Sequence, residues 1–106
     1  MLVKTYGSAV FGVSATTITI EVNLNSGINF ILVGLPDNAV KESQKRIVAA
    51  VKNCGYKYPK MELTVNMAPA DIRKEGSAYD LTIALGILAA SNQVEQANLE
   101  KYIIMG

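Results

Sequence analysis

Ser77 and Lys74 are the two residues whose types and spacing come nearest to a catalytic pair. They stand at the end of a charged loop that separates a predicted strand from a predicted apolar helix. A lysine amine beside a serine hydroxyl could accept its proton and activate it as a nucleophile. Ser77 and Asp80 also have the spacing of a helix capping box, although that motif prefers Glu or Gln where Asp80 stands. Because serine commonly caps an apolar helix, we predict a structural role for Ser77 and no catalytic residue in the chain.

A glycine turn that leads into a helix, residues 34–38, is the segment where a phosphate group could bind. Free backbone N–H groups at a helix start attract anions. The sequence lacks the repeated glycines and the lysine of a phosphate-binding loop, GxxxxGK[ST]. Asp37 also places a carboxylate where the phosphate would lie. We therefore predict that Asp37 caps a helix and that the chain has no nucleotide site or other cofactor site.

Acidic residues near the charged loop suggest a metal site as one interpretation. Asp71, Glu75 and Asp80 could supply carboxylate oxygens to Mg²⁺. The basic neighbours Arg73 and Lys74 favour ion pairs instead. We therefore predict no metal site, with magnesium on the three acids as the alternative.

A modestly basic surface is predicted along the first helix and just after it. It is formed by Lys41, Lys45, Lys52, Lys57 and Lys60. Such a run is usually a solvated face, and we predict that here, with nucleic-acid contact as the alternative. Cys54 falls on the apolar stripe of the same helix and is predicted to be a small core residue.

The composition of the 106-residue chain narrows the chemistry further. Ten basic and nine acidic residues leave a formal net charge of +1, and half of the residues are hydrophobic, which excludes intrinsic disorder. There is no histidine, so Ser–His or Cys–His catalysis and imidazole metal ligands are excluded within the chain. We find neither an apolar run of about 18 residues nor the pattern of a secretory signal. The single cysteine fits a reducing compartment, and we predict a cytoplasmic protein without membrane contact.

Three strands are predicted in the N-terminal third. Residues 3–13 are rich in Val, Thr, Tyr and Phe, and residues 16–24 alternate apolar and polar side chains, as a strand with one exposed face does. After a turn at 25–27, residues 29–33 contain an apolar run that is too continuous for an exposed strand. The short turns favour three adjacent antiparallel strands.

The rest of the chain alternates between helical and strand patterns. A helix is predicted from Asp37 to Cys54, with Gly55 as its left-handed end. A strand over 61–67, a mostly buried helix over 77–91 and a final apolar strand over 101–105 follow. The order strand–strand–strand–helix–strand–helix–strand predicts an α+β two-layer sandwich with the helices on one face of a mixed sheet.

Two segments carry a resemblance to a known family. Residues 33–43 read VGLPDNAVKES and resemble the pattern VGLP(D/E)xAVxES of the Mg-chelatase-like AAA+ ATPases of the ComM type. Residues 66–76 read NMAPADIRKEG and, with DLTIALGIL at 80–88, resemble that family's second block, NLAPADLPKEGxxFDLPIALGIL. The likeness covers essentially the whole chain. It departs from the pattern at Arg73 and Thr82, where prolines are usual, and at Tyr79, which replaces Phe.

The resemblance implies a fold like the second domain of ribosomal protein S5, shared with the proteolytic domain of Lon. In that comparison Ala78 takes the position of the peptidase serine, and the lysine partner would come from beyond residue 106. The resemblance also implies a longer protein, with an AAA+ module that binds ATP and Mg²⁺ and a C-terminal Mg-chelatase-like region. We therefore interpret residues 1–106 as a single partial domain from the N-terminus of such a protein.

A non-catalytic role in assembly or substrate docking is the function we predict from this resemblance. The family implies a hexameric ATPase that acts on branched DNA in natural transformation, so further copies of the chain and DNA are the implied partners. Two alternatives stay open: a Ser–Lys peptidase domain that uses Ser77, and an S5-like nucleic-acid-binding module. Because a strand over 101–105 would leave an unpaired sheet edge, we also expect self-association.

Overall fold

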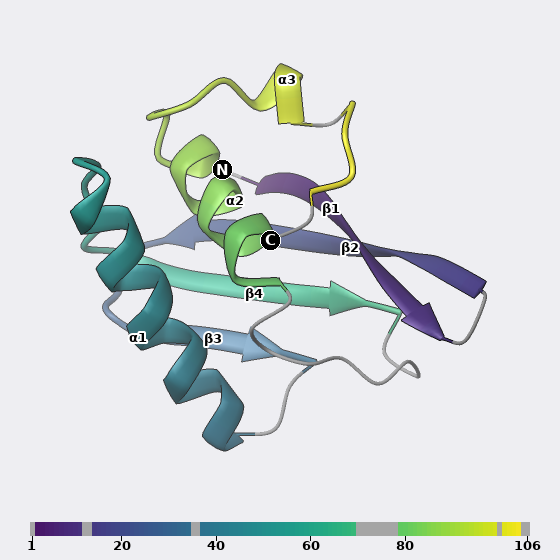
Figure 1. The fold of residues 1–106 in the computed structure, drawn as a ribbon. Helices are drawn as coiled ribbons and strands as arrows, with labels where there is room; N and C mark the ends of the chain where they lie inside the picture. Colours follow the sequence, from purple (N-terminus) through teal and green to yellow (C-terminus); the bar gives the residue numbers. More distant parts are fainter. Residues whose placement is uncertain (1, 12–13, 35–36, 70–78, 100, 105–106) are drawn as a thin grey trace.

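The computed structural model describes residues 2–11, 14–34, 37–69, 79–99 and 101–104. Within them the chain forms a four-stranded sheet with the helices on one of its faces (Figure 1). The strands are β1 (Leu2–Phe11), β2 (Ser14–Asn25), β3 (Phe30–Val33) and β4 (Glu62–Ala68), and the helices are α1 (Asp37–Asn53), α2 (Asp80–Ala90) and α3 (Gln96–Leu99). The predicted α+β class is confirmed, and the first six elements follow the predicted order.

The strand order in the sheet is β1-β2-β4-β3, so β4 lies between β2 and β3. β1 and β4 are both antiparallel to β2, whereas β3 is parallel to β4. The prediction of three adjacent antiparallel strands is therefore wrong for β3. α1 connects β3 to β4 as a crossover, and a crossover of this kind joins parallel strands. The arrangement puts β4 inside the sheet, where Leu63 and Val65 are at most 1 % exposed.

β3 is an edge strand with only one covered face. Leu32 is buried, whereas Ile31 and Val33 are 41 % and 53 % exposed. The prediction that the apolar run at 29–33 is too continuous for an exposed strand is wrong, because the helices cover only one face of the sheet.

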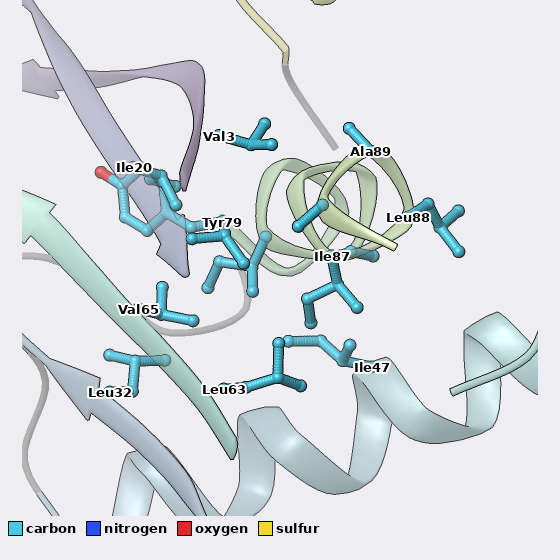
Figure 2. Packing of buried hydrophobic residues seen from close by; sticks show 14 of the residues in the cluster. Val3, Ile20, Leu32, Ile47, Leu63, Val65, Tyr79, Ile87, Leu88 and Ala89 are labelled. Atoms are coloured by element: carbon cyan, nitrogen blue, oxygen red, sulfur yellow. The ribbon is translucent and has the colours of Figure 1, made fainter. Parts of the chain in front are cut away.

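The core lies between the sheet and the two long helices. Alternate residues of β2 and β4 face the helices, namely Ile18, Ile20, Val22, Leu24, Leu63, Val65 and Met67, as the period-two pattern predicts. Figure 2 shows Ile47 of α1 and Ile87 of α2 meeting over Leu63. α2 is buried around most of its surface, as predicted. Within the described ranges, no helix has both the length and the apolar character needed to cross a membrane.

The ends of the helices agree with the sequence in part. α1 begins at Asp37, as predicted, but the Asp37 side chain lies outside the described residues. At the other end of α1, Gly55 has a left-handed φ of 85°, as predicted, and the helix closes with a Schellman motif. In this motif the Gly55 N–H donates to the Lys52 carbonyl at 3.1 Å. The Tyr56 N–H donates to the Val51 carbonyl, also at 3.1 Å. α2 begins at Asp80 with Tyr79 at its N-cap, so the predicted capping box, which needs Asp80 at the third helical position, is wrong for this helix.

Cys54 is exposed, so its prediction as a core residue is wrong. The buried stripe of α1 ends one turn earlier, at Val51. Residues 52–57 are all exposed, because no described element covers the last turn of this helix.

The C-terminal residues do not form the predicted final strand over 101–105 in the part that is described. Ile103 makes one isolated parallel bridge with Tyr6 of β1. The Ile104 N–H donates to the Tyr6 carbonyl at 2.7 Å, and the buried Thr82 hydroxyl donates to the Ile104 carbonyl at 3.2 Å.

Candidate functional site

Asp80, the first residue of α2, joins the two long helices. Its carboxylate accepts hydrogen bonds from the Ser43 hydroxyl at 2.9 Å and from Arg46 Nε at 2.5 Å, and both of these residues are on α1. Arg46 Nη2 also donates to Asp80 Oδ1 at 3.4 Å. Ser43 is fully buried, and the Asp80 side chain is 19 % exposed. Charge-assisted hydrogen bonds of this kind are stronger than neutral ones, so the cluster fixes α1 against α2.

The charges of this cluster bear on the magnesium site considered from the sequence. Arg46 also lies 3.9 Å from Glu42, one turn earlier on α1. The hydrogen bond to Asp80 is the largest cause that raises the pKa of Arg46, so the guanidinium stays charged. A permanent cation on both Asp80 oxygens opposes a second cation there. Asp80 therefore fits a structural ion pair better than a metal ligand.

The loop after α1, residues 55–60, leads to β4 (Figure 1). Three anchors hold this loop in place. The first is the Schellman motif, which fixes the backbone of Tyr56. The second is Gln93, whose Oε1 accepts from the Lys57 N–H at 2.8 Å and whose Nε2 donates to the Lys57 carbonyl at 2.7 Å. The third is the side chain of Tyr58, which is partly buried and packs against the hydrophobic core. A segment without regular secondary structure thus has a fixed backbone.

This loop lines a pocket of about 480 Å³. The lining residues are Lys52, Tyr56, Lys57, Tyr58, Pro59 and Lys60. A neighbouring pocket of about 290 Å³ shares Tyr58, Pro59 and Lys60 and continues to Phe30 and Gln44. Ligand pockets commonly have volumes of about 300–1,000 Å³, so the hollow is of a size that binds small groups. Partial burial raises the pKa of Tyr58, and its hydrogen bond with Gln44 opposes this effect.

The predicted basic surface is divided by the structure into two parts. All five of its lysines are exposed, as a solvated face predicts. Lys52, Lys57 and Lys60 line the larger pocket, whereas Lys41 and Lys45 stand earlier on α1 and are not among the lining residues.

The other sequence-predicted site residues are only partly described. Asp80 is the only residue of the predicted capping box, and of the alternative metal site, that lies within the described residues. Its carboxylate accepts hydrogen bonds from Ser43 and Arg46 of α1. Ser77, Lys74, Asp71 and Glu75 lie outside the described residues, and so do Arg73 and Ala78, so the predictions on the chemistry of these residues stay predictions. Among the described residues, no group of three or more His, Cys, Asp or Glu is placed to hold a metal ion.

Sequence reasoning missed Ser43, Arg46 and Gln93. Their partners are 34 to 37 positions away, and no local pattern marks such pairs. Tyr56 and Tyr58 did carry a signal, because they alternate with lysines directly after the helix-ending glycine.

Comparison with known proteins gives a consistent set of relatives. Residues 20–106 match the family model described as subunit ChlI of Mg-chelatase. Competence protein ComM of Haemophilus influenzae is 50 % identical over 98 residues, and YifB of Salmonella typhimurium is 48 % identical over 99 residues, in each case over 92 % of this chain. A protein of Mycobacterium tuberculosis is 38 % identical over 104 residues, or 97 % of the chain. The chain spans about a fifth of the length of these relatives, between 19 % and 21 %.

The α+β fold and these matches define a Mg-chelatase-like domain of the kind found in AAA+ proteins. The chain belongs to the ChlI family. The resemblance predicted from residues 33–43 and 66–76 is thereby confirmed.

Proposed function

We propose that this chain is the N-terminal, Lon-like domain of a Mg-chelatase-like AAA+ ATPase and that it acts in assembly or substrate docking, not in catalysis. One observation carries the proposal: relatives that include a competence protein align along 92 % of this chain but only about a fifth of their own length. ATP and Mg²⁺ would then bind in another part of the whole protein. That protein would assemble as a hexamer in the cytoplasm and act on branched DNA.

The packing of the described residues supports a scaffold role. The Asp80 cluster ties α2 to α1, and the Thr5 hydroxyl of β1 donates to the Thr82 carbonyl of α2 at 3.0 Å. Among the described residues, every buried side-chain nitrogen and oxygen has a hydrogen-bond partner. Interior polar groups that are hydrogen-bonded within the protein stabilise its fold. Recognition of a partner is then expected at the exposed loops.

Calorimetry tests the non-catalytic part of the proposal. Because the sequence has no phosphate-binding loop, titration of the 106-residue chain with ATP and Mg²⁺ should give no binding of micromolar affinity. Micromolar binding would contradict the assignment of ATP turnover to another module.

Deletion tests the docking part. A whole protein that contains this chain should be compared with a version that lacks residues 1–106. The shortened protein should still bind ATP but should lose either its ring, measured by light scattering, or the stimulation of its ATPase activity by DNA. A shortened protein that retains both would refute the docking role.

A further inference from the structure

The loop at residues 55–60 supports an inference that rests on the proposed docking role and names a ligand and its site. We propose that the pocket beside it binds single-stranded nucleic acid. Tyr56 stacks on an unpaired base, and Lys52, Lys57 and Lys60 contact the phosphates that flank it. The carrying observation is that two tyrosines and three lysines line one pocket of about 480 Å³.

The local charge favours an anionic ligand. Residues 52–60 contain three lysines and no acidic residue, whereas the whole chain has a net charge of only +1. The described residues that line the pocket likewise include three cations and no carboxylate. A concentrated positive potential of this kind attracts the closely spaced phosphates of a nucleic-acid strand.

The tyrosines distinguish a single strand from other polyanions. Tyr56 is 40 % exposed, so part of its side chain is available for stacking. Tyr58 is partly buried and packs against the hydrophobic core, which makes it a fixed wall of the pocket. Aromatic side chains stack on bases of any sequence once the bases are unpaired, whereas bases inside a duplex are stacked on one another. An acidic peptide would satisfy the lysines but would leave the exposed Tyr56 side chain without a planar partner.

Gln93 acts as a positioning residue. Its amide group binds both the N–H and the carbonyl of Lys57, which stands between the two tyrosines. The Gln93 Nε2 is also 2.8 Å from the Ser91 hydroxyl, so the Gln93 side chain is itself held. A loop that is fixed before binding loses less conformational entropy when the strand binds, which strengthens the complex.

The test is fluorescence anisotropy of a short fluorescein-labelled oligothymidylate, titrated with the 106-residue chain at increasing KCl. Binding should weaken with salt with a slope of about −0.7 for each phosphate contact. Lys57→Ala should reduce the steepness of this slope by about 0.7. Tyr56→Ala should weaken binding roughly 5- to 150-fold without changing the slope. Gln93→Met has a similar length and no charge but cannot bind the Lys57 backbone, so it should weaken binding and leave the slope unchanged.

Lys41→Ala is the matched control. Lys41 is exposed on the same helix, about 16 Å from Lys52 along its axis, and should not affect binding. Circular dichroism establishes that each variant is folded. The proposal is overturned if the folded chain does not bind the oligonucleotide at low salt, if Lys41→Ala weakens binding as much as Lys57→Ala, or if Tyr56→Ala has no effect. Polyglutamate or duplex DNA that competes better than unlabelled oligothymidylate would also overturn it. None of these outcomes depends on ATP binding or on ring assembly.

Discussion

Gly86 of α2 lies directly against β2, and we predict that its replacement by alanine destabilises the protein. A Cβ atom at this position would lie 2.7 Å from Val22 Cγ2 and 3.5 Å from Thr5 Oγ1. Carbon atoms in contact are normally about 3.5–4.0 Å apart. The helix would therefore have to move away by ~1 Å, and this movement would loosen the packing of Ile83 and Ile87, which are fully buried on the same helix.

Two opposing effects set the magnitude. Alanine is favoured over glycine inside a helix by about 1 kcal/mol. Overpacking of a core typically costs about 1–3 kcal/mol. Val22 cannot easily relieve the overlap, because it is fully buried, β-branched and stiff about χ1. We therefore expect Gly86→Ala to lower the free energy of unfolding by about 1–2 kcal/mol, which corresponds to a fall in Tm of roughly 5–10 °C.

Urea unfolding followed by circular dichroism measures this effect. The wild type should be compared with Gly86→Ala, Val22→Ala and the double variant. Val22→Ala alone is destabilising because it leaves a cavity, but it removes the atom that the new methyl group would strike. The double variant should therefore be more stable than the sum of the single effects predicts, by about 1 kcal/mol. Unchanged stability in Gly86→Ala, or strict additivity in the double variant, would refute the reasoning.

The remaining predictions concern the polar groups. In the same urea assay, Ser43→Ala should lower the free energy of unfolding by about 1.5–3 kcal/mol. Asp80→Ala should lower it further, because it leaves the buried Ser43 hydroxyl without its acceptor. The reverse order of the two variants would contradict the role of the cluster. Burial raises the pKa of Tyr58 above its ordinary value of 10.0, so the stability that it contributes should be present below pH 10 and lost as the pH rises through the raised pKa. In a titration followed by tyrosinate absorbance, the tyrosine that ionises at the raised pKa should disappear in Tyr58→Phe. If it persists in that variant, the assignment to Tyr58 is wrong. A serine-directed covalent inhibitor should not label Ser77, and labelling would indicate catalysis.

The sequence by itself determined most of the local structure of this protein. The alternation at 16–24 and 61–67 identified the two strands that supply most of the sheet's buried side chains, because each strand has one face against the helices. The apolar stripe predicted up to Cys54, together with Gly55, located α1 and its end, although Cys54 itself is exposed. The two sequence blocks also identified the family. Such features are encoded locally, since backbone preferences and side-chain periodicity depend on residues that are close in the chain.

Only the tertiary structure decided how these elements combine. The sequence did not indicate that β4 separates β3 from β2. Nor did it indicate that the helices cover only one face of the sheet, which leaves Ile31 and Val33 exposed. It also did not indicate that Asp80 bonds to α1, or that Gln93 holds Lys57 from 36 positions away. The sequence therefore contains the lysines and tyrosines of the candidate binding pocket in one segment after a helix, but it does not indicate how they are placed. The fixed geometry of the pocket depends on long-range contacts, which form only when distant segments pack together and which leave no periodic pattern in either segment.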